Sequence, residues 1–138
     1  HARLGVKVGA PERGVVAVIG DGCYQMTIQE LGTIFQTQAA VKIVVLNNDF
    51  LGMVRQWQQL FFDKRYASTE MVNPDFVTIA KGYFLDAKRV DKRKNLDAAV
   101  AEMIASDKPY FLEVCVEKED NVFPMIPTGA SVSDIRLK

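Results

Sequence analysis

The chain has 138 residues, enough for one domain with a hydrophobic core. Its 17 basic side chains equal its 17 acidic ones, which implies no basic surface, and we expect no nucleic-acid partner. No apolar run approaches the ~20 residues of a membrane span, so we expect no membrane partner. The single histidine, at position 1, argues against Ser-His-Asp or Cys-His catalysis within this chain. The two cysteines lack metal-ligand spacing, as is typical of reduced thiols in a cytosolic protein.

Three continuous apolar runs predict strands that are buried on both faces, as in a parallel sheet. They span residues 15–19, 43–46 and 110–116, and a shorter strand is expected at 84–90. Strands that alternate with helices predict an α/β fold with three layers and a doubly wound, mostly parallel sheet. We expect this domain to fill residues 1–120 and residues 121–138 to form an extended tail. The first residues look like the end of a helix, so we expect a fragment of a longer protein.

Three helices are expected between the strands. Thr27-Ile28-Gln29-Glu30 has the spacing of a capping box and predicts a helix over 28–37. Asn73-Pro74-Asp75 offers an N-cap, a proline at the first helical position and an early acid, which predicts a helix that ends near Gly82. The third helix is expected at 96–105. Its predicted inward residues are Leu96, Ala99, Val100, Met103 and Ile104.

Polar residues follow two of the predicted strands directly. Gly20-Asp21-Gly22 follows the first run, and Asn47-Asn48 follows the second. In open parallel sheets ligands bind beyond the carboxyl ends of the strands, where both motifs would lie. A carboxylate and an amide oxygen suit a hard cation such as Mg²⁺, which can hold a diphosphate. The flanking glycines allow close approach of a ligand, and a helix that starts near Thr27 would favour an anion.

Each motif also has a purely structural interpretation. Gly-Asp-Gly is a common turn, and Asn-Asn is a common start of a loop. A nicotinamide-binding site would require G-x-G-x-x-G, and the segment from Gly20 to Gln25 lacks the third glycine. Because both motifs follow apolar strands and are separated by residues 23–46, a shared metal and diphosphate site is the favoured interpretation.

The two motifs at this spacing resemble the thiamine-diphosphate motif of the large thiamine-dependent enzyme superfamily. Four neighbouring segments narrow the resemblance to the acetolactate synthase (acetohydroxyacid synthase) family, catalytic large subunit. These segments are Tyr24–Leu31, Asn47–Trp57, Asn73–Phe76 and Pro124–Ala130. The resemblance covers nearly the whole chain, as the C-terminal thiamine-diphosphate-binding domain of that family.

The resemblance implies thiamine diphosphate and Mg²⁺ as cofactors. The ligands of Mg²⁺ would be the side chains of Asp21 and Asn48 and the backbone carbonyl of Phe50. Cys23 stands where a small residue such as serine is expected, so an amide contact would survive and a hydroxyl contact would not. The residues expected to bind the cofactor are Gly20, Asp21, Gly22, Cys23, Asn48, Gly52 and Met53.

The resemblance also assigns Met53, Val54 and Trp57 to a substrate channel, where the tryptophan restricts the acceptor site. The alternative is a helix that buries an apolar stripe, because Phe50, Val54, Trp57 and Phe61 have helical spacing. The more solvent-exposed face of that helix is expected to carry Arg55, Gln56, Gln58 and Gln59.

The reaction implied by the resemblance is decarboxylation of pyruvate and addition of the remaining two-carbon unit to pyruvate or 2-oxobutyrate, in branched-chain amino-acid biosynthesis. It also implies 2-oxo acid substrates, a homodimer or tetramer, a regulatory small subunit, and a cytoplasmic location, or a plastid in a plant. The activating glutamate and an FAD site would lie on other domains of the full-length enzyme, so we expect no catalytic residue in this chain and no activity from it alone. Open alternatives are another thiamine-diphosphate-dependent decarboxylase, oxidase or carboligase, and a non-catalytic diphosphate-binding module.

Overall fold

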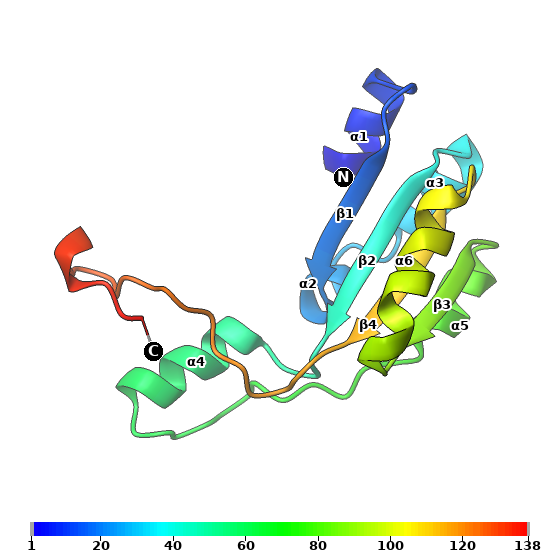
Figure 1. The fold of residues 1–138 in the computed structure, drawn as a ribbon. Helices are drawn as coiled ribbons and strands as arrows, with labels where there is room; N and C mark the ends of the chain where they lie inside the picture. Colours follow the sequence, from blue (N-terminus) through cyan, green and yellow to red (C-terminus); the bar gives the residue numbers. More distant parts are fainter. Residues whose placement is uncertain (1, 138) are drawn as a thin grey trace.

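A four-stranded parallel sheet organises the chain, whose computed structural model describes residues 2–137. The strands lie side by side in the order β1-β2-β4-β3, and all of their carboxyl ends point the same way (Figure 1). Their bounds are Val15–Gly20 for β1, Val41–Asn47 for β2, Asp86–Val90 for β3 and Tyr110–Cys115 for β4. The predicted α/β class, with helices on both faces of a parallel sheet, is confirmed.

Six α-helices connect or flank these strands in the described part of the chain. They are α1 (Ala2–Gly9), α2 (Asp21–Gln25), α3 (Glu30–Thr37), α4 (Gly52–Phe61), α5 (Phe76–Gly82) and α6 (Leu96–Ala105), with short 3₁₀ turns at Arg93–Asn95 and Val132–Asp134. The predicted helix at 96–105 and the helix end at Gly82 are confirmed. None of the helices in residues 2–137 is long and apolar enough to cross a membrane.

The capping box expected at Thr27 is wrong. The Thr27 hydroxyl donates to the carbonyl oxygen of Cys23 at 3.3 Å, and it does not cap a helix. Threonine commonly bonds backward to a carbonyl in this way, which competes with capping. The chain passes through turns after α2, and α3 begins at Glu30, two residues later than predicted.

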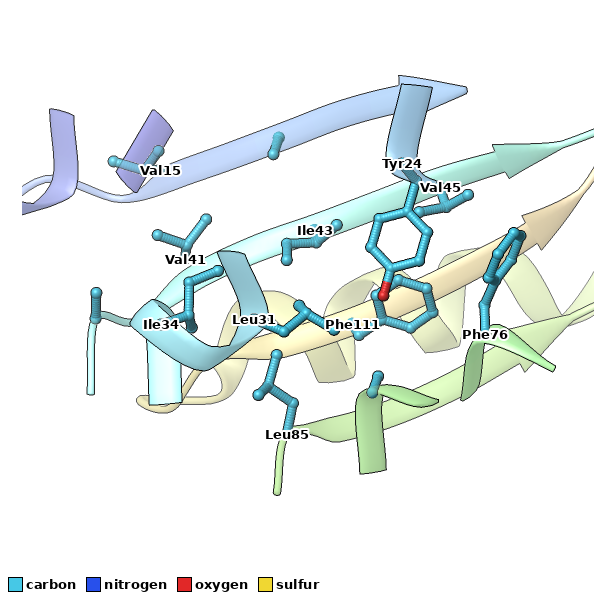
Figure 2. Packing of buried hydrophobic residues seen from close by; sticks show 13 residues of the cluster. Val15, Tyr24, Leu31, Ile34, Val41, Ile43, Val45, Phe76, Leu85 and Phe111 are labelled. Atoms are coloured by element: carbon cyan, nitrogen blue, oxygen red, sulfur yellow. The ribbon is translucent and has the colours of Figure 1, made fainter. Parts of the chain in front are cut away.

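The main hydrophobic core lies between one face of the sheet and helices α3 and α5. Tyr24 of α2 sits at its centre, with its ring centroid 5.1 Å from those of both Phe76 and Phe111 (Figure 2). Leu31 and Ile34 of α3 close the core over β1 and β2. Because Tyr24 is in the helix that begins with Asp21, packing of this ring fixes the loop at the end of β1.

The second face of the sheet is covered only in part. Helix α6 packs Ala99 and Met103 against β4 and β3, whereas the predicted inward residues Val100 and Ile104 are exposed. On β1, Val16 and Val18 are 45% and 55% exposed, so the expectation of burial on both faces is wrong for this strand. The physical reason is geometric, since α6 lies over the opposite half of the sheet (Figure 1).

The central core phenylalanine gives a direct test of this packing. We expect Phe111→Ala to lower the free energy of unfolding by about 3–5 kcal/mol, because it leaves a cavity beside Tyr24. Phe84→Ala is the matched control, since Phe84 is 77% exposed and contacts one ring, that of Phe35. Phe84→Ala should lower the free energy of unfolding by less than about 1.5 kcal/mol. Equal costs in chemical denaturation would contradict the assigned core.

Candidate functional site

A cleft of about 610 Å³ opens beyond the carboxyl ends of β1 and β2. Nine of the residues singled out from the sequence line it. They are Gly20, Asp21, Gly22, Cys23, Asn48, Phe50, Gly52, Met53 and Val54. The opposite wall comes from the segment after β4, including Val116, Asp120 and Val122. Trp57 is not among the lining residues; it borders a neighbouring hollow, which shares Val54 with the cleft.

Asp21 is the buried anion of this cleft, with 2% of its surface exposed. Its Oδ1 accepts a hydrogen bond from the backbone N–H of Gly22 at 2.9 Å. Its Oδ2 accepts from the backbone N–H of Asp49 at 3.0 Å and from the side-chain amide of Asn73 at 2.7 Å. A carboxylate offers about four acceptor positions, so three protein donors fix Asp21 and leave one position on Oδ1 for a further ligand.

An unpredicted helix, α2, begins at Asp21 itself, so the helix start beside the cleft belongs to α2 and not to the helix expected near Thr27. Gly20 is the N-cap of α2, with extended backbone geometry, and no atom lies within 4 Å of the place where a Cβ on Gly20 would stand. Helix α2 has five residues, too few for a strong dipole. Space for an anion at this loop therefore comes from the glycine backbone, with little help from the helix.

The loop after β2 carries the other predicted ligands. Asp49 adopts a left-handed backbone with φ of 54°, and this turn directs its N–H to Asp21. The amide oxygen of Asn48 accepts from the N–H of Phe50 at 3.3 Å. A Cβ added at Gly52 would lie 3.1 Å from Nδ2 of Asn48, so a larger residue there would crowd the Asn48 side chain. Asp21, Asn48 and Phe50 thus meet at one edge of the sheet, as the parallel strands predicted.

Asn73 is a site residue that the sequence analysis missed. It was expected to cap α5, but Asp75 is the N-cap, and its carboxylate accepts from the N–H groups of Val77 and Thr78. Asn73 instead bonds to Asp21, which lines the cleft. Both Asn and Asp are good capping residues, so composition alone gave no signal to separate their roles.

A buried glutamate behind the site, paired with the partly exposed Arg89, was also missed. Glu113 on β4 is fully buried and accepts from Nε of Arg89 at 2.7 Å and from the amide of Asn47 at 2.8 Å. The hydrogen bond to Glu113 raises the pKa of Arg89. Glu113 lies within a predicted buried strand, but its partners come from β2 and β3. Those neighbours are set by the strand order, which sequence patterns do not specify.

Helix α4 buries Arg55 and Gln56, two of the four residues expected on its exposed face, whereas Gln58 and Gln59 are partly exposed as expected. Arg55 and Gln56 are 4% and 1% exposed, whereas Met53 and Val54 are 51% and 48% exposed. The reason is that α4 stands beyond the sheet and packs against the chain segment that follows β4 (Figure 1). The side-chain amide of Gln56 donates to the carbonyl of Val122 and accepts from its N–H, so it pairs with the backbone as a neighbouring β-strand would.

The donor set indicates which cations this edge of the sheet could hold. Within residues 2–137 no three His, Cys, Asp or Glu side chains group as a metal site. An ion at the cleft would therefore rely on one carboxylate together with amide and carbonyl oxygens. Such all-oxygen sites suit Mg²⁺ and do not suit zinc, which prefers imidazole and thiolate ligands.

Comparison with known families agrees with this geometry. A family model described as "Thiamine pyrophosphate enzyme, C-terminal TPP binding domain" matches residues 2–114. The chain belongs to this family of thiamine pyrophosphate-dependent enzymes, as their C-terminal cofactor-binding domain. A solved structure, the thiamine diphosphate-dependent 4-hydroxybenzoylformate decarboxylase of Rhodococcus jostii RHA1, superposes with a TM-score of 0.79 at 28% identity, covering 86% of this chain and 22% of that one.

Within this family, the chain resembles acetolactate synthase large subunits at about 40% identity. It is 43% identical to the acetolactate synthase isozyme 2 large subunit of Escherichia coli K12, over 99% of this chain and 25% of the relative. It is 40% identical to the mitochondrial acetolactate synthase catalytic subunit of Saccharomyces cerevisiae, over 96% of this chain and 19% of the relative. It is 41% identical to the chloroplastic acetolactate synthase 1 of rice, over 99% of this chain and 22% of the relative. The chain therefore spans a quarter or less of the length of these relatives.

Gln56 provides a test of the wall that α4 builds. Gln56→Ala removes both hydrogen bonds to Val122 from a buried position. We expect the free energy of unfolding to fall by about 1–3 kcal/mol and the Val122 amide to exchange its hydrogen faster. Gln58→Ala is a matched control, because Gln58 makes the same pair of bonds to Ala67 near the surface. A larger loss of stability from Gln58→Ala would contradict the assigned burial.

Proposed function

We propose that this chain is the C-terminal part of a thiamine-diphosphate-dependent acetolactate synthase. The proposed reaction decarboxylates pyruvate and joins the remaining two-carbon unit to pyruvate or 2-oxobutyrate, as a step of branched-chain amino-acid biosynthesis. The family match supports thiamine diphosphate as the cofactor, and three relatives named as acetolactate synthases support the reaction. When bound, the cofactor supplies the bond-breaking chemistry, and the protein binds and orients it.

The observation that carries the proposal is the buried, fixed carboxylate of Asp21, which lines the cleft. Asp21 and Asn48 would ligate Mg²⁺ through side-chain oxygens, and Phe50 would do so through its backbone carbonyl. The residues fit this role because Asp21 keeps one acceptor position and Asn48 accepts one hydrogen bond through Oδ1, which has two lone pairs. Backbone groups of Gly22, Cys23, Gly52 and Met53 would then contact the diphosphate and the middle of the cofactor.

The apolar side of α4 supports a role in substrate binding. Met53 and Val54 are half exposed at the cleft, although the same helix buries Arg55 and Gln56. A helix that only served the core would bury its apolar residues. We propose that Met53, Val54 and Trp57 line the path of the 2-oxo acids. Trp57, which stacks on Phe61 at 4.7 Å between ring centroids, would limit the size of the acceptor.

The proposed enzyme would use further parts on other domains. The activating glutamate and an FAD site are proposed to lie on other domains, so the chain alone would form no acetolactate. The names of two relatives, large subunit and catalytic subunit, support a partner regulatory subunit, and we propose a homodimer or tetramer of the full-length chain. Residues 121–138 would serve as a tail beyond the cofactor domain at 1–120. The location would be cytoplasmic, or a plastid if the source is a plant, as the chloroplastic relative indicates.

A second candidate function is favoured by the structural likeness to a benzoylformate-type decarboxylase. Decarboxylases, oxidases and carboligases of the superfamily would use the same metal motif. A non-catalytic diphosphate-binding module is the remaining alternative. Product analysis of the full-length enzyme with pyruvate separates a synthase, which yields acetolactate, from a pyruvate decarboxylase, which yields acetaldehyde. With a panel of other 2-oxo acids, a decarboxylase yields the corresponding aldehyde, and a non-catalytic module yields no product.

The metal assignment is tested by Asp21→Asn in the full-length protein. We expect its affinity for Mg²⁺, measured by calorimetry in the presence of thiamine diphosphate, to fall about 10- to 100-fold, because a neutral oxygen replaces a charged one. Asp120→Asn is the matched control, since Asp120 lines the same cleft on the opposite wall. Equal affinities for the parent and both variants would remove the metal site.

A further inference from the structure

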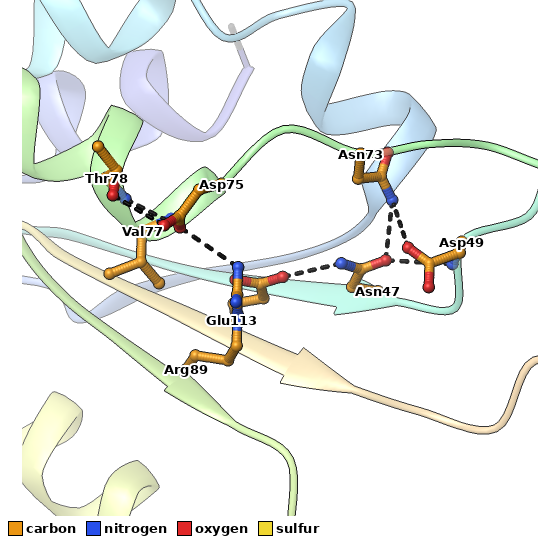
Figure 3. A network of polar contacts seen from close by, with 8 residues as sticks. All are labelled: Asn47, Asp49, Asn73, Asp75, Val77, Thr78, Arg89 and Glu113. Atoms are coloured by element: carbon orange, nitrogen blue, oxygen red, sulfur yellow. Dashed lines mark hydrogen bonds and ion pairs between the residues drawn. The ribbon is translucent and has the colours of Figure 1, made fainter.

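A closed ring of polar contacts lies behind the cleft, at the carboxyl edge of the sheet (Figure 3). Asn73 donates to Asn47, Asn47 donates to Glu113, and Glu113 pairs with Arg89. Arg89 also contacts Asp75 at 3.3 Å, and Asp75 follows Asn73 by two residues, which closes the ring through the backbone. The ring ties β2, β3 and β4 to the start of α5.

The charge of Glu113 sets the direction of the amide hydrogen bonds in this ring. Ionised carboxylates only accept hydrogen bonds, so Asn47 must present its amide NH₂ group to Glu113 at 2.8 Å. The carbonyl oxygen of Asn47 then points away from Glu113, toward Asp49 and Asn73 (Figure 3). That oxygen accepts from the backbone N–H of Asp49 at 3.1 Å and from Asn73 at 2.9 Å. Of the two ends of the Asn73 amide, only the NH₂ group can donate such a bond. The same NH₂ group is therefore held toward Asp21.

The amide nitrogen of Asn73 stands where three oxygens converge. It lies 2.7 Å from Oδ2 of Asp21, 2.9 Å from Oδ1 of Asn47 and 3.1 Å from Oδ1 of Asp49. Asp21 and Asp49 are both acidic, and a shared donor between them offsets their mutual repulsion. On the far side, the oxygen of Asn73 accepts from Gln25 at 2.7 Å, which opposes a flip of the amide.

We propose that Asn73 is a positioning residue for the metal-binding carboxylate of Asp21, and that Glu113 sets its orientation through Asn47. The inference rests on the proposed function, because it takes Asp21 as a ligand of Mg²⁺. By holding Oδ2, Asn73 turns the open position of Oδ1 toward the cleft. Without this donor Asp21 keeps the backbone bonds to Gly22 and Asp49, and its side chain gains freedom to rotate.

The test measures Mg²⁺ affinity in the full-length protein carrying Asn73→Ala. Mutation of partners that orient a metal ligand commonly lowers affinity about 10- to 100-fold, and we expect a loss in this range by calorimetry with thiamine diphosphate present. Excess Mg²⁺ should restore cofactor binding and turnover, which a merely misfolded variant would not show. Glu113→Gln, which keeps the size of the side chain, should weaken Mg²⁺ binding in the same direction but less.

Two further variants separate the possible outcomes. Thr78→Val removes the hydroxyl bond to Asp75 at the same end of α5 and leaves Asn73 in place, so its Mg²⁺ affinity should equal that of the parent. If Asp21→Asn weakens Mg²⁺ binding but Asn73→Ala and Glu113→Gln do not, the positioning role is wrong and the metal site stands. If Asp21→Asn has no effect, the proposed function fails first. Loss of binding in Asn73→Ala that excess Mg²⁺ does not restore also overturns the positioning role.

Discussion

The burial of one carboxylate, that of Asp21, constrains the whole carboxyl edge of the sheet. A buried charge without partners is costly, so the fold must bring donors to it from several directions. Those donors come from α2, from the loop after β2 and from the segment before α5. Three stretches of chain distant in sequence are thereby fixed around a single group. The same requirement leaves one oxygen position directed to the cleft, and the proposed binding of Mg²⁺ depends on it.

In this arrangement the sheet forms the base of the site and α4 forms one of its walls. The sheet, its hydrophobic core and the ring through Glu113 form a rigid base, as expected for sites that hold a charged cofactor. Helix α4 and the segment after β4 form walls that are joined by polar bonds from Arg55 and Gln56. Apolar side chains of α4 are left facing the cleft, where they are free to contact a substrate.

The sequence was informative wherever a single local pattern decided the structure. Continuous apolar runs predicted the strands, and the polar residues at their ends predicted which side chains would meet at one edge. It misled where two partners competed, as with Thr27, which bonds to Cys23, and Asn73, which leaves the cap of α5 to Asp75. It also failed for Arg55 and Gln56, because their burial depends on a segment more than sixty residues away. Contacts between residues so far apart in the sequence produce no periodic pattern from which they could be predicted.

We propose that Asp21, Asn48 and the backbone carbonyl of Phe50 together would hold the metal ion. The most direct measurement is a crystal structure of the full-length protein with thiamine diphosphate and Mn²⁺, located by its anomalous scattering. We expect one peak at bonding distance from all three oxygens, with Asn73 still donating to Asp21. A peak elsewhere in the cleft, with the cofactor bound and Asp21 turned away from it, would contradict the claim.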